Sequence, residues 1–264
     1  MQKRHQDSSL YLSEQIYTTE KYVIPFIEQN ATIVPGTKVL EVGCGEGGDL
    51  KPFADRGCYC IGIDINEQKI NKGRSYYKEN QPSGGSIQLL VENIYDKNDL
   101  GDTFDIIFLR DVIEHIPGQE ALLCHLRNFM NENTVLFFAF PPWQNPFGGH
   151  QQICRNKFLS HIPFLHLLPK WLYGRVLKSF RENPNCVNEL LEIKDTSITI
   201  GQFHRYLSSA KLSVKRETFY FINPHYEIKF GLKPRKTWSL ITKIPYLRNF
   251  VTTSLYCNVG LSDL

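Results

Sequence analysis

Acidic residues are missing from two long parts of this chain. No Asp or Glu occurs from Asn133 to Arg181, although six Lys or Arg residues fall in that stretch, and the run from Lys229 to Arg248 again holds six basic residues and no acid. The net charge of the whole chain is nevertheless only +3. A charge this small does not indicate nucleic acid unless it is gathered on one face. We therefore expect no nucleic-acid partner.

Long apolar runs and paired cysteine motifs are also missing. Without an apolar run of about 18 residues, no membrane-spanning helix is expected. The start, Met1–Asp7, is polar and no apolar segment follows it, so we expect no secretory signal. None of the seven cysteines stands in a Cys-x-x-Cys motif. We therefore expect reduced thiols, a cytoplasmic location, and neither a disulfide framework nor a metal site.

A cluster of glycines follows the first apolar run of the chain. Lys38–Val42 is apolar and β-branched, four glycines come next, and apolar residues then recur at helical spacing. This pattern predicts a strand, a tight loop and a helix. Glycine leaves no Cβ between the main chain and a ligand, and the N–H groups of the following helix face the same space. A second apolar run ends at Asp64, where an acid accepts hydrogen bonds from ribose hydroxyls in nucleotide-binding sheets.

Two cofactors fit this loop. The dinucleotide pattern needs Gly43, Gly45 and Gly48. The tighter pattern of S-adenosylmethionine-dependent methyltransferases keeps the first two and adds Glu41 and Gly47. At these residues the chain resembles a class I methyltransferase. Glu41 favours this interpretation, because a carboxylate at the end of a buried strand is costly unless something satisfies it.

A second part of the resemblance follows the predicted fourth strand. Phe104–Leu109 is a nearly continuous apolar run, typical of a strand buried on both faces of a parallel sheet. The next segment, Arg110–Pro117, resembles the one that follows the fourth strand in small-molecule, methyltransferase-11-like enzymes. Ligands of open α/β sheets lie at the carboxyl ends of the strands, so this segment faces the site. Its conspicuous titratable residue, His115, is a candidate acid, base or substrate contact, or a packing or capping residue of a short helix.

The resemblance implies a doubly wound, Rossmann-like sheet with helices on both faces. Its seven strands would have the order 3-2-1-4-5-7-6, with the last one antiparallel. The patterns predict strands at 38–42, 58–64, 86–91, 104–109, 134–140, 212–221 and 250–259, and helices at 11–30, 66–80 and 121–130.

The same resemblance divides the chain into three parts. Residues 1–36 are expected to be helical and to cover the cofactor, 37–142 and 198–264 to form the methyltransferase domain, and 143–197 to be an inserted helical lid. Pro163 and Pro169 predict short helices there. A basic, aromatic lid suits an anionic or amphiphilic substrate. A membrane-surface role and a solvated basic rim are the two other interpretations.

The resemblance also implies site residues. Asp64 would bind the ribose, Glu92 the adenine amine, and Ile65 and Ile94 the faces of the ring. Tyr17, on the leading helix, is placed near the cofactor carboxylate. The full set of expected cofactor contacts is Glu41, Gly43, Cys44, Gly45, Gly47, Asp64, Ile65, Glu92, Asn93, Ile94, Arg110 and Tyr17. His150, in the lid, and His115 are the candidate general bases.

The sequence therefore predicts methyl transfer from S-adenosylmethionine to a small or amphiphilic, lipid-like or anionic, acceptor by in-line displacement. Two alternatives stay open at this point. One is an NAD(P)-dependent oxidoreductase, in which Glu41 and Arg110–Pro117 have no role. The other is a non-catalytic cofactor-binding module that acts through its basic lid. The sequence determines neither the acceptor nor the oligomeric state, and it leaves peripheral membrane contact open.

Overall fold

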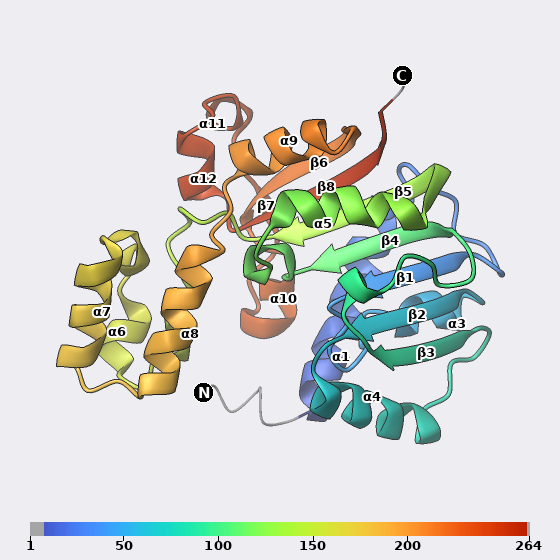
Figure 1. Cartoon of the computed structure of the whole chain (residues 1–264), viewed down its shortest axis with the longest axis horizontal. Helices are drawn as coiled ribbons and strands as arrows, with labels where there is room; N and C mark the ends of the chain where they lie inside the picture. The colour runs from blue at the N-terminus through green and yellow to red at the C-terminus, as the bar shows by residue number, and fades with distance from the viewer. Residues whose placement is uncertain (1–7, 263–264) are drawn as a thin grey trace.

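One mixed sheet of eight strands organises the structure, a computed structural model that describes residues 8–262. Residues 1–7, on which the expectation of no secretory signal rests, lie outside the described part. Figure 1 shows the sheet, whose order is β3-β2-β1-β4-β5-β8-β6-β7. The strands are β1 Lys38–Val42, β2 Tyr59–Asp64, β3 Ser86–Val91, β4 Phe104–Arg110, β5 Met130–Phe140, β6 Leu212–Ile222, β7 Arg235–Lys236 and β8 Ser254–Leu261.

The predicted topology is confirmed, with one addition at the edge. Strands β1 to β5 are parallel, and β8, the expected seventh strand, runs antiparallel between β5 and β6. The addition is β7, whose two residues pair with Tyr220 and Ile222 of β6. A two-residue strand has no periodicity of its own, so its sequence carries no signal.

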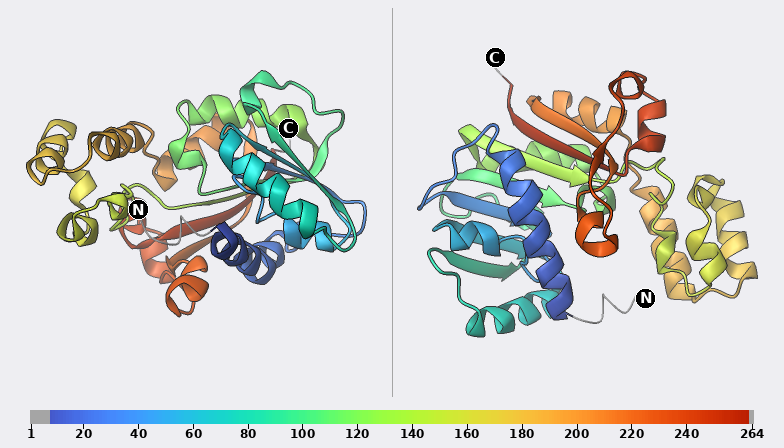
Figure 2. Two further views of the ribbon diagram at one scale, coloured as in Figure 1. Left: turned by 90° about the horizontal axis from the view of Figure 1, so that it is seen from below. Right: turned by 180° about the vertical axis from the view of Figure 1, so that it is seen from behind.

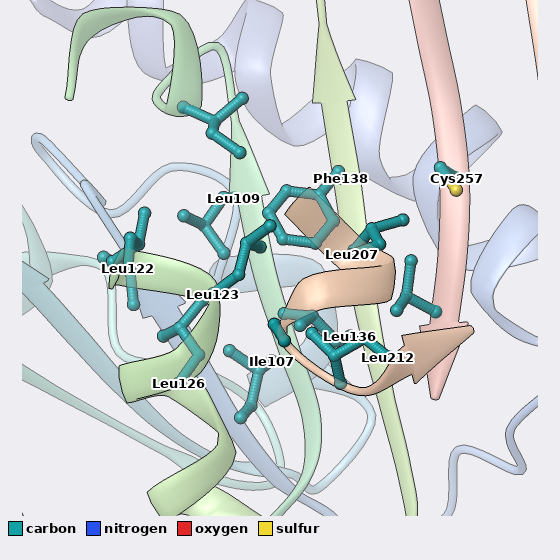
Figure 3. Packing of buried hydrophobic residues seen from close by; sticks show 14 of the residues in the cluster. Ile107, Leu109, Leu122, Leu123, Leu126, Leu136, Phe138, Leu207, Leu212 and Cys257 are labelled. Atoms are coloured by element: carbon teal, nitrogen blue, oxygen red, sulfur yellow. The ribbon is translucent and has the colours of Figure 1, made fainter. Parts of the chain in front are cut away.

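Helices cover both faces of the sheet, because alternate residues of each parallel strand supply two separate cores. One core joins β1, β4 and β5 to η2 Thr19–Val23, α2 Ile24–Ile27, α3 Lys51–Asp55 and α4 Glu67–Glu79. The other, drawn in Figure 3, joins Leu109 and Phe138 of the sheet to Leu123 of α5 Gln119–Leu126 and Leu207 of α9 Ile200–Ser209.

The leading helix is broken into three pieces, where the sequence predicts a single helix. α1 spans Ser8–Thr18, a π-helical turn covers Thr19–Val23, and α2 follows with Pro25 in its first turn. The π turn places the Thr19 hydroxyl on the carboxylate of Asp49, at the end of the glycine loop. Single π turns are common at functional sites, and this one joins the leading helix to the loop.

The insertion is a small helical unit with its own core. It holds η6 Gln151–Ile153, α6 Lys157–His161, η7 Leu165–Leu167, α7 Lys170–Ser179 and α8 Pro184–Asp195. Leu159, Leu177 and Leu190 pack together inside it. Its two ends meet, because the Trp143 amide donates to the Ile198 carbonyl at 2.8 Å. Figures 1 and 2 show the unit beyond the carboxyl ends of the parallel strands, as a lid requires.

The segment between β6 and β8 supplies a strap across the leading helix. It contains α10 His225–Phe230, α11 Ser239–Thr242 and α12 Leu247–Val251. Glu227 of α10 accepts hydrogen bonds from Tyr17 at 3.1 Å and from Lys21 at 2.8 Å, and also from Tyr22. Within residues 8–262, every helix is too short or too polar to cross a bilayer.

Candidate functional site

Three glycines of the loop have left-handed backbone conformations, and the loop packs closely against its neighbours. Gly43, Gly45 and Gly47 have φ of 77°, 57° and 79°. A Cβ at Gly43 would lie 2.5 Å from Cγ2 of Val112, so the loop packs against the segment after β4. A Cβ at Gly45 would make one ordinary contact, with Cδ of Lys69 at 3.6 Å, so the protein leaves room beside Gly45. Cys44 points into the core and is 1% exposed.

Asp64 closes the loop from the neighbouring strand. Its Oδ2 accepts the Gly45 amide at 2.7 Å, and its Oδ1 accepts the Asn66 amide at 2.8 Å. These two bonds fix the carboxylate at the carboxyl end of β2, next to the room beside Gly45. The next residue, Ile65, is 76% exposed. An exposed apolar side chain at this place offers a face for a planar ring.

A buried polar network lies behind the loop. Arg110 Nη2 contacts Asp49 Oδ1 at 3.0 Å, and both side chains are almost fully buried. Glu41, 2% exposed, hydrogen-bonds Asp49 and leaves Oε2 without a partner. Burial, and then the charge of Asp49, raise the pKa of Glu41 well above its usual range. Glu41 is therefore the protonated member, and Asp49 is the anion that pairs with Arg110.

The third strand ends in three residues with different environments. Glu92 Oε1 pairs with Lys97 Nζ at 3.1 Å. The side chain of Asn93 is exposed and accepts the Tyr95 amide at 3.1 Å, which caps a short 3-10 turn. Ile94 is 5% exposed and belongs to the sheet core. The structure thus leaves Glu92 and Asn93 at the surface beside the loop and turns Ile94 inward.

Tyr17 has a partner in the protein itself. Its hydroxyl donates to Glu227, and Lys21 Nζ lies 2.7 Å from the same hydroxyl. A direct contact between Tyr17 and a cofactor carboxylate stays a prediction. The strap residue Glu227 has no signal in the sequence, because it lies 210 positions after Tyr17.

His115 and His150 come together at the carboxyl ends of β4 and β5. Their ring centroids are 4.8 Å apart, and the rings meet edge to face. His115 Nε2 lies 3.9 Å from Glu114 Oε1, and neither carboxyl oxygen of Glu114 has a hydrogen-bond partner among the described residues. Burial lowers the pKa of both imidazoles, that of His150 to about 3, so both rings are neutral at neutral pH.

Three site residues escape the sequence analysis. Glu114 is buried although it adjoins His115, and Asp49 is buried although it follows two glycines. Lys69 borders the room beside Gly45, with its Cδ 3.6 Å from the position of a Gly45 Cβ, and its charge lowers the pKa of His115. A charged residue next to a motif is usually solvated, so only the fold identifies these three as parts of the site.

The donors and the room beside Gly45 fit S-adenosylmethionine. This room, the carboxylate of Asp64 and the exposed Ile65 suit a nucleoside. Arg110 Nη1 is buried without a partner, in the network beside the loop. At the carboxyl ends of β1 and β2 the structure brings together Gly43, Gly45, Gly47, Asp64 and Ile65. The side chains of Cys44 and Ile94 instead turn into the core, and every contact with the cofactor stays a prediction.

Comparison with known proteins gives the family of the chain. A protein-family model described as a methyltransferase domain matches residues 16–182. The ubiquinone biosynthesis O-methyltransferase of Histophilus somni is 30% identical over 159 residues, which cover 54% of this chain and 67% of that enzyme. The enzyme of the same name from Hahella chejuensis is 27% identical over 116 residues, 44% of this chain and 48% of the relative. The chain thus spans between about half and two thirds of the length of these relatives.

Solved structures share the fold. Magnesium protoporphyrin IX methyltransferase from Synechocystis PCC 6803, with bound S-adenosylhomocysteine, superposes with a TM-score of 0.55 at 16% identity, over 96% of this chain and 84% of that one. An S-adenosylmethionine-dependent methyltransferase from Clostridium acetobutylicum superposes with a TM-score of 0.58 at 10% identity, over 94% and 92%. The family match covers more than half of the chain, so the protein belongs to the methyltransferase domain family and is a class I S-adenosylmethionine-dependent methyltransferase.

Proposed function

We propose that this protein methylates a hydroxyl group of a small, ring-bearing or amphiphilic acceptor. The observation that carries the proposal is the pair of neutral imidazoles, His115 and His150, at the carboxyl ends of β4 and β5. A hydroxyl that attacks a methyl group must lose its proton, and a neutral imidazole accepts one. The relatives named as O-methyltransferases support the choice of oxygen.

The cofactor supplies a methyl group already activated on a sulfonium centre, so the protein contributes position and a base. The amides and the carboxylate around Gly45 and Asp64 would hold the nucleoside end. Glu41, Asp49 and Arg110 keep the loop in place from behind. The 38% exposed side chain of His115 is the better placed to meet an acceptor. In this proposal an imidazole nitrogen of His115 takes the hydroxyl proton, while His150 and Glu114 position the ring.

The insertion at residues 143–197 is the proposed substrate lid. It lies beyond the strand ends that carry the site, and it supplies His150. Lys194 Nζ stands 5.1 Å from the ring of Trp143, and Arg175 lies 5.7 Å from that of Trp171. Cationic groups over aromatic rings suit an acceptor with an apolar body and a negative group. Family membership removes the nicotinamide-dependent alternative, and the cytoplasmic location stays a prediction.

The experiment is a methyl-transfer assay with labelled S-adenosylmethionine and ring-hydroxylated acceptors, with and without a carboxylate and an apolar tail. We expect the labelled methyl group on a hydroxyl oxygen of the acceptor, as an ether. The His115→Ala variant should lose methyl transfer and still bind S-adenosylhomocysteine. His161→Ala is the control, because this exposed histidine lies in the insertion and not in the turn after β4, and its recorded bonds go to the local groups Lys157 and Ser160. A product labelled on nitrogen or carbon would contradict the proposal, and so would full transfer by the His115 variant.

A further inference from the structure

The helical insertion contains a second group of chemically active side chains, separate from the cofactor site. Cys154, Glu182 and Cys186 each offer a ligand atom, and these three atoms lie within 4.8 Å of one another. Cys154 and Glu182 are buried, and Cys186 is half-buried. We propose that these three residues bind one thiophilic divalent cation of the zinc type, which ties the insertion together. Two thiolates and a carboxylate are a donor set that such a cation prefers.

The three ligands come from separate segments, which explains why the sequence shows no metal motif. Cys154 follows η6, Glu182 lies in the turn between α7 and α8, and Cys186 is in the first turn of α8. The spacing of 28 and 4 residues is not that of a common zinc motif. Only the folding of the insertion brings the two sulfur atoms and the carboxylate close together.

The carboxylate of Glu182 is already oriented for a ligand role. Its Oε1 accepts the Asn156 amide at 2.7 Å and its Oε2 accepts the Arg155 amide at 3.1 Å. These bonds fix the carboxylate next to Cys154 and leave further lone pairs on both oxygens. Hydrogen bonds to the outer side of a ligating group are what metal sites use to orient their ligands.

A buried tyrosine provides an independent observation. Tyr173 is 0% exposed, and its hydroxyl has no hydrogen-bond partner among the described residues. Tyr173 packs in the small core of the insertion together with Cys154 and Cys186. A buried hydroxyl without a partner is costly, and a metal-bound water at this place would satisfy it.

The size of the insertion gives the cation a structural purpose. Residues 143–197 pack around their own small core rather than the core of the sheet. Units below about 70 residues seldom bury enough apolar surface, and a bound metal is one of the means that stabilise them. The site also ties the start of the insertion to its last long helix. Cys154 lies four residues after His150, so the cation would hold the turn that carries this histidine.

The test uses the full-length, reduced protein and Co²⁺ as a probe. Thiolate ligands give Co²⁺ an intense near-ultraviolet charge-transfer band, which histidine and carboxylate ligands do not. We expect this band to saturate at one Co²⁺ per chain and to be displaced by Zn²⁺. Cys154→Ser and Cys186→Ser should each weaken it, because one of the two thiolates is lost, whereas the exposed cysteine control Cys124→Ser should keep it unchanged.

A second measurement needs no variant and so does not depend on the folding of one. Alkylation of the wild-type protein, followed by mass spectrometry, reports each thiol separately. We expect Zn²⁺ to slow the labelling of Cys154 and Cys186 and to leave Cys124 unchanged. The proposal is overturned if the reduced protein shows no charge-transfer band, or if the band keeps its full intensity in either serine variant. Binding without the band would instead place the ion at Glu114, His115 and His150, whose ligand atoms also lie close together, and would equally contradict the proposal.

Discussion

His115 and His150 stand edge to face, with ring centroids 4.8 Å apart and an interplanar angle of 87°. They are 35 positions apart in the chain and follow two neighbouring parallel strands. Protonation of either ring would place a positive charge against the other in a partly buried site. Burial lowers the pKa of both imidazoles, and the neighbouring His115 lowers that of His150 further, so both rings are neutral at neutral pH.

The first prediction concerns this pair. We expect His115→Ala to lower kcat by about a hundredfold, because a positioned base contributes at least that much to proton transfer. His150→Ala should lower it less, since that ring acts on the orientation of His115. Affinity for S-adenosylhomocysteine should stay unchanged in both, as measured by calorimetry. A fall in cofactor affinity equal to the fall in kcat would show that the histidines serve the cofactor instead.

The second prediction separates backbone strain from loss of space at the glycine loop. Gly45 and Gly101 both have positive φ, 57° and 90°, so alanine is strained at either. A Cβ at Gly101 would meet nothing within 4 Å, and Gly101 lies in the loop before β4, away from the site. We expect both alanine variants to lose about 1 kcal/mol of unfolding free energy. Only Gly45→Ala should lose S-adenosylhomocysteine binding, and equal binding by the two variants would contradict the assignment of the room beside Gly45 to the cofactor.

Much of the sheet was predictable, because short, nearly continuous apolar runs next to glycine-containing turns identify parallel strands. Ser86–Val91 and Lys38–Val42 have the bounds that the pattern predicts. The helix expected at 66–80 is also confirmed as α4, and Asn66 caps its start by accepting the Lys69 amide. Strand ends that depend on pairing with a neighbouring strand were predicted less well. Strand β5 begins at Met130 because that residue pairs with Phe104 across a bulge.

The site was predictable where a motif has a fixed place on the fold, as at Gly45 and Asp64. It was not predictable where distant segments meet. Tyr17 bonds Glu227, and Cys154 meets Cys186, through tertiary contacts that leave no spacing in the sequence. The expectation of no metal site rested on the absence of a local motif, which a site built from three separate turns does not need.

The third prediction concerns stability in acid. His166 is 0% exposed, its Nε2 donates to the Trp143 carbonyl at 2.7 Å, and its Nδ1 has no partner. Burial and the charge of Lys194 lower the pKa of His166 to about 4. Since this value is below the ordinary 6.5, the unfolded chain binds more protons between the two values. The stabilisation is therefore complete above pH 6.5 and is lost as the pH falls toward 4.

We expect His166→Gln to unfold with a shallower pH dependence in that window than the wild-type chain. The glutamine amide can still donate to the Trp143 carbonyl and does not titrate. Urea unfolding at several pH values between 4 and 7 measures the slope. Identical slopes for the two proteins would show that His166 does not carry the acid sensitivity.

The fourth prediction tests the network behind the loop. Arg110→Met should cost about 3–5 kcal/mol of unfolding free energy, because it leaves Asp49 as an unpaired buried charge. Glu41→Gln should cost about 1 kcal/mol or less, because glutamine resembles the protonated acid in shape and also donates. Urea unfolding compares the two. A large loss in the Glu41 variant would mean that Glu41 is ionised in the folded protein.

The most direct test of the site is calorimetric titration of the wild-type protein and Asp64→Ala with S-adenosylhomocysteine. Asp99→Ala is the matched control, since Asp99 also accepts a backbone amide, that of Gly101, but lies in the loop before β4. We expect one site per wild-type chain, unchanged binding by the Asp99 variant, and an affinity at least about tenfold lower for the Asp64 variant, as loss of a charge-assisted hydrogen bond implies. Equal affinity in all three proteins would contradict the placement of the cofactor at the carboxyl ends of β1 and β2.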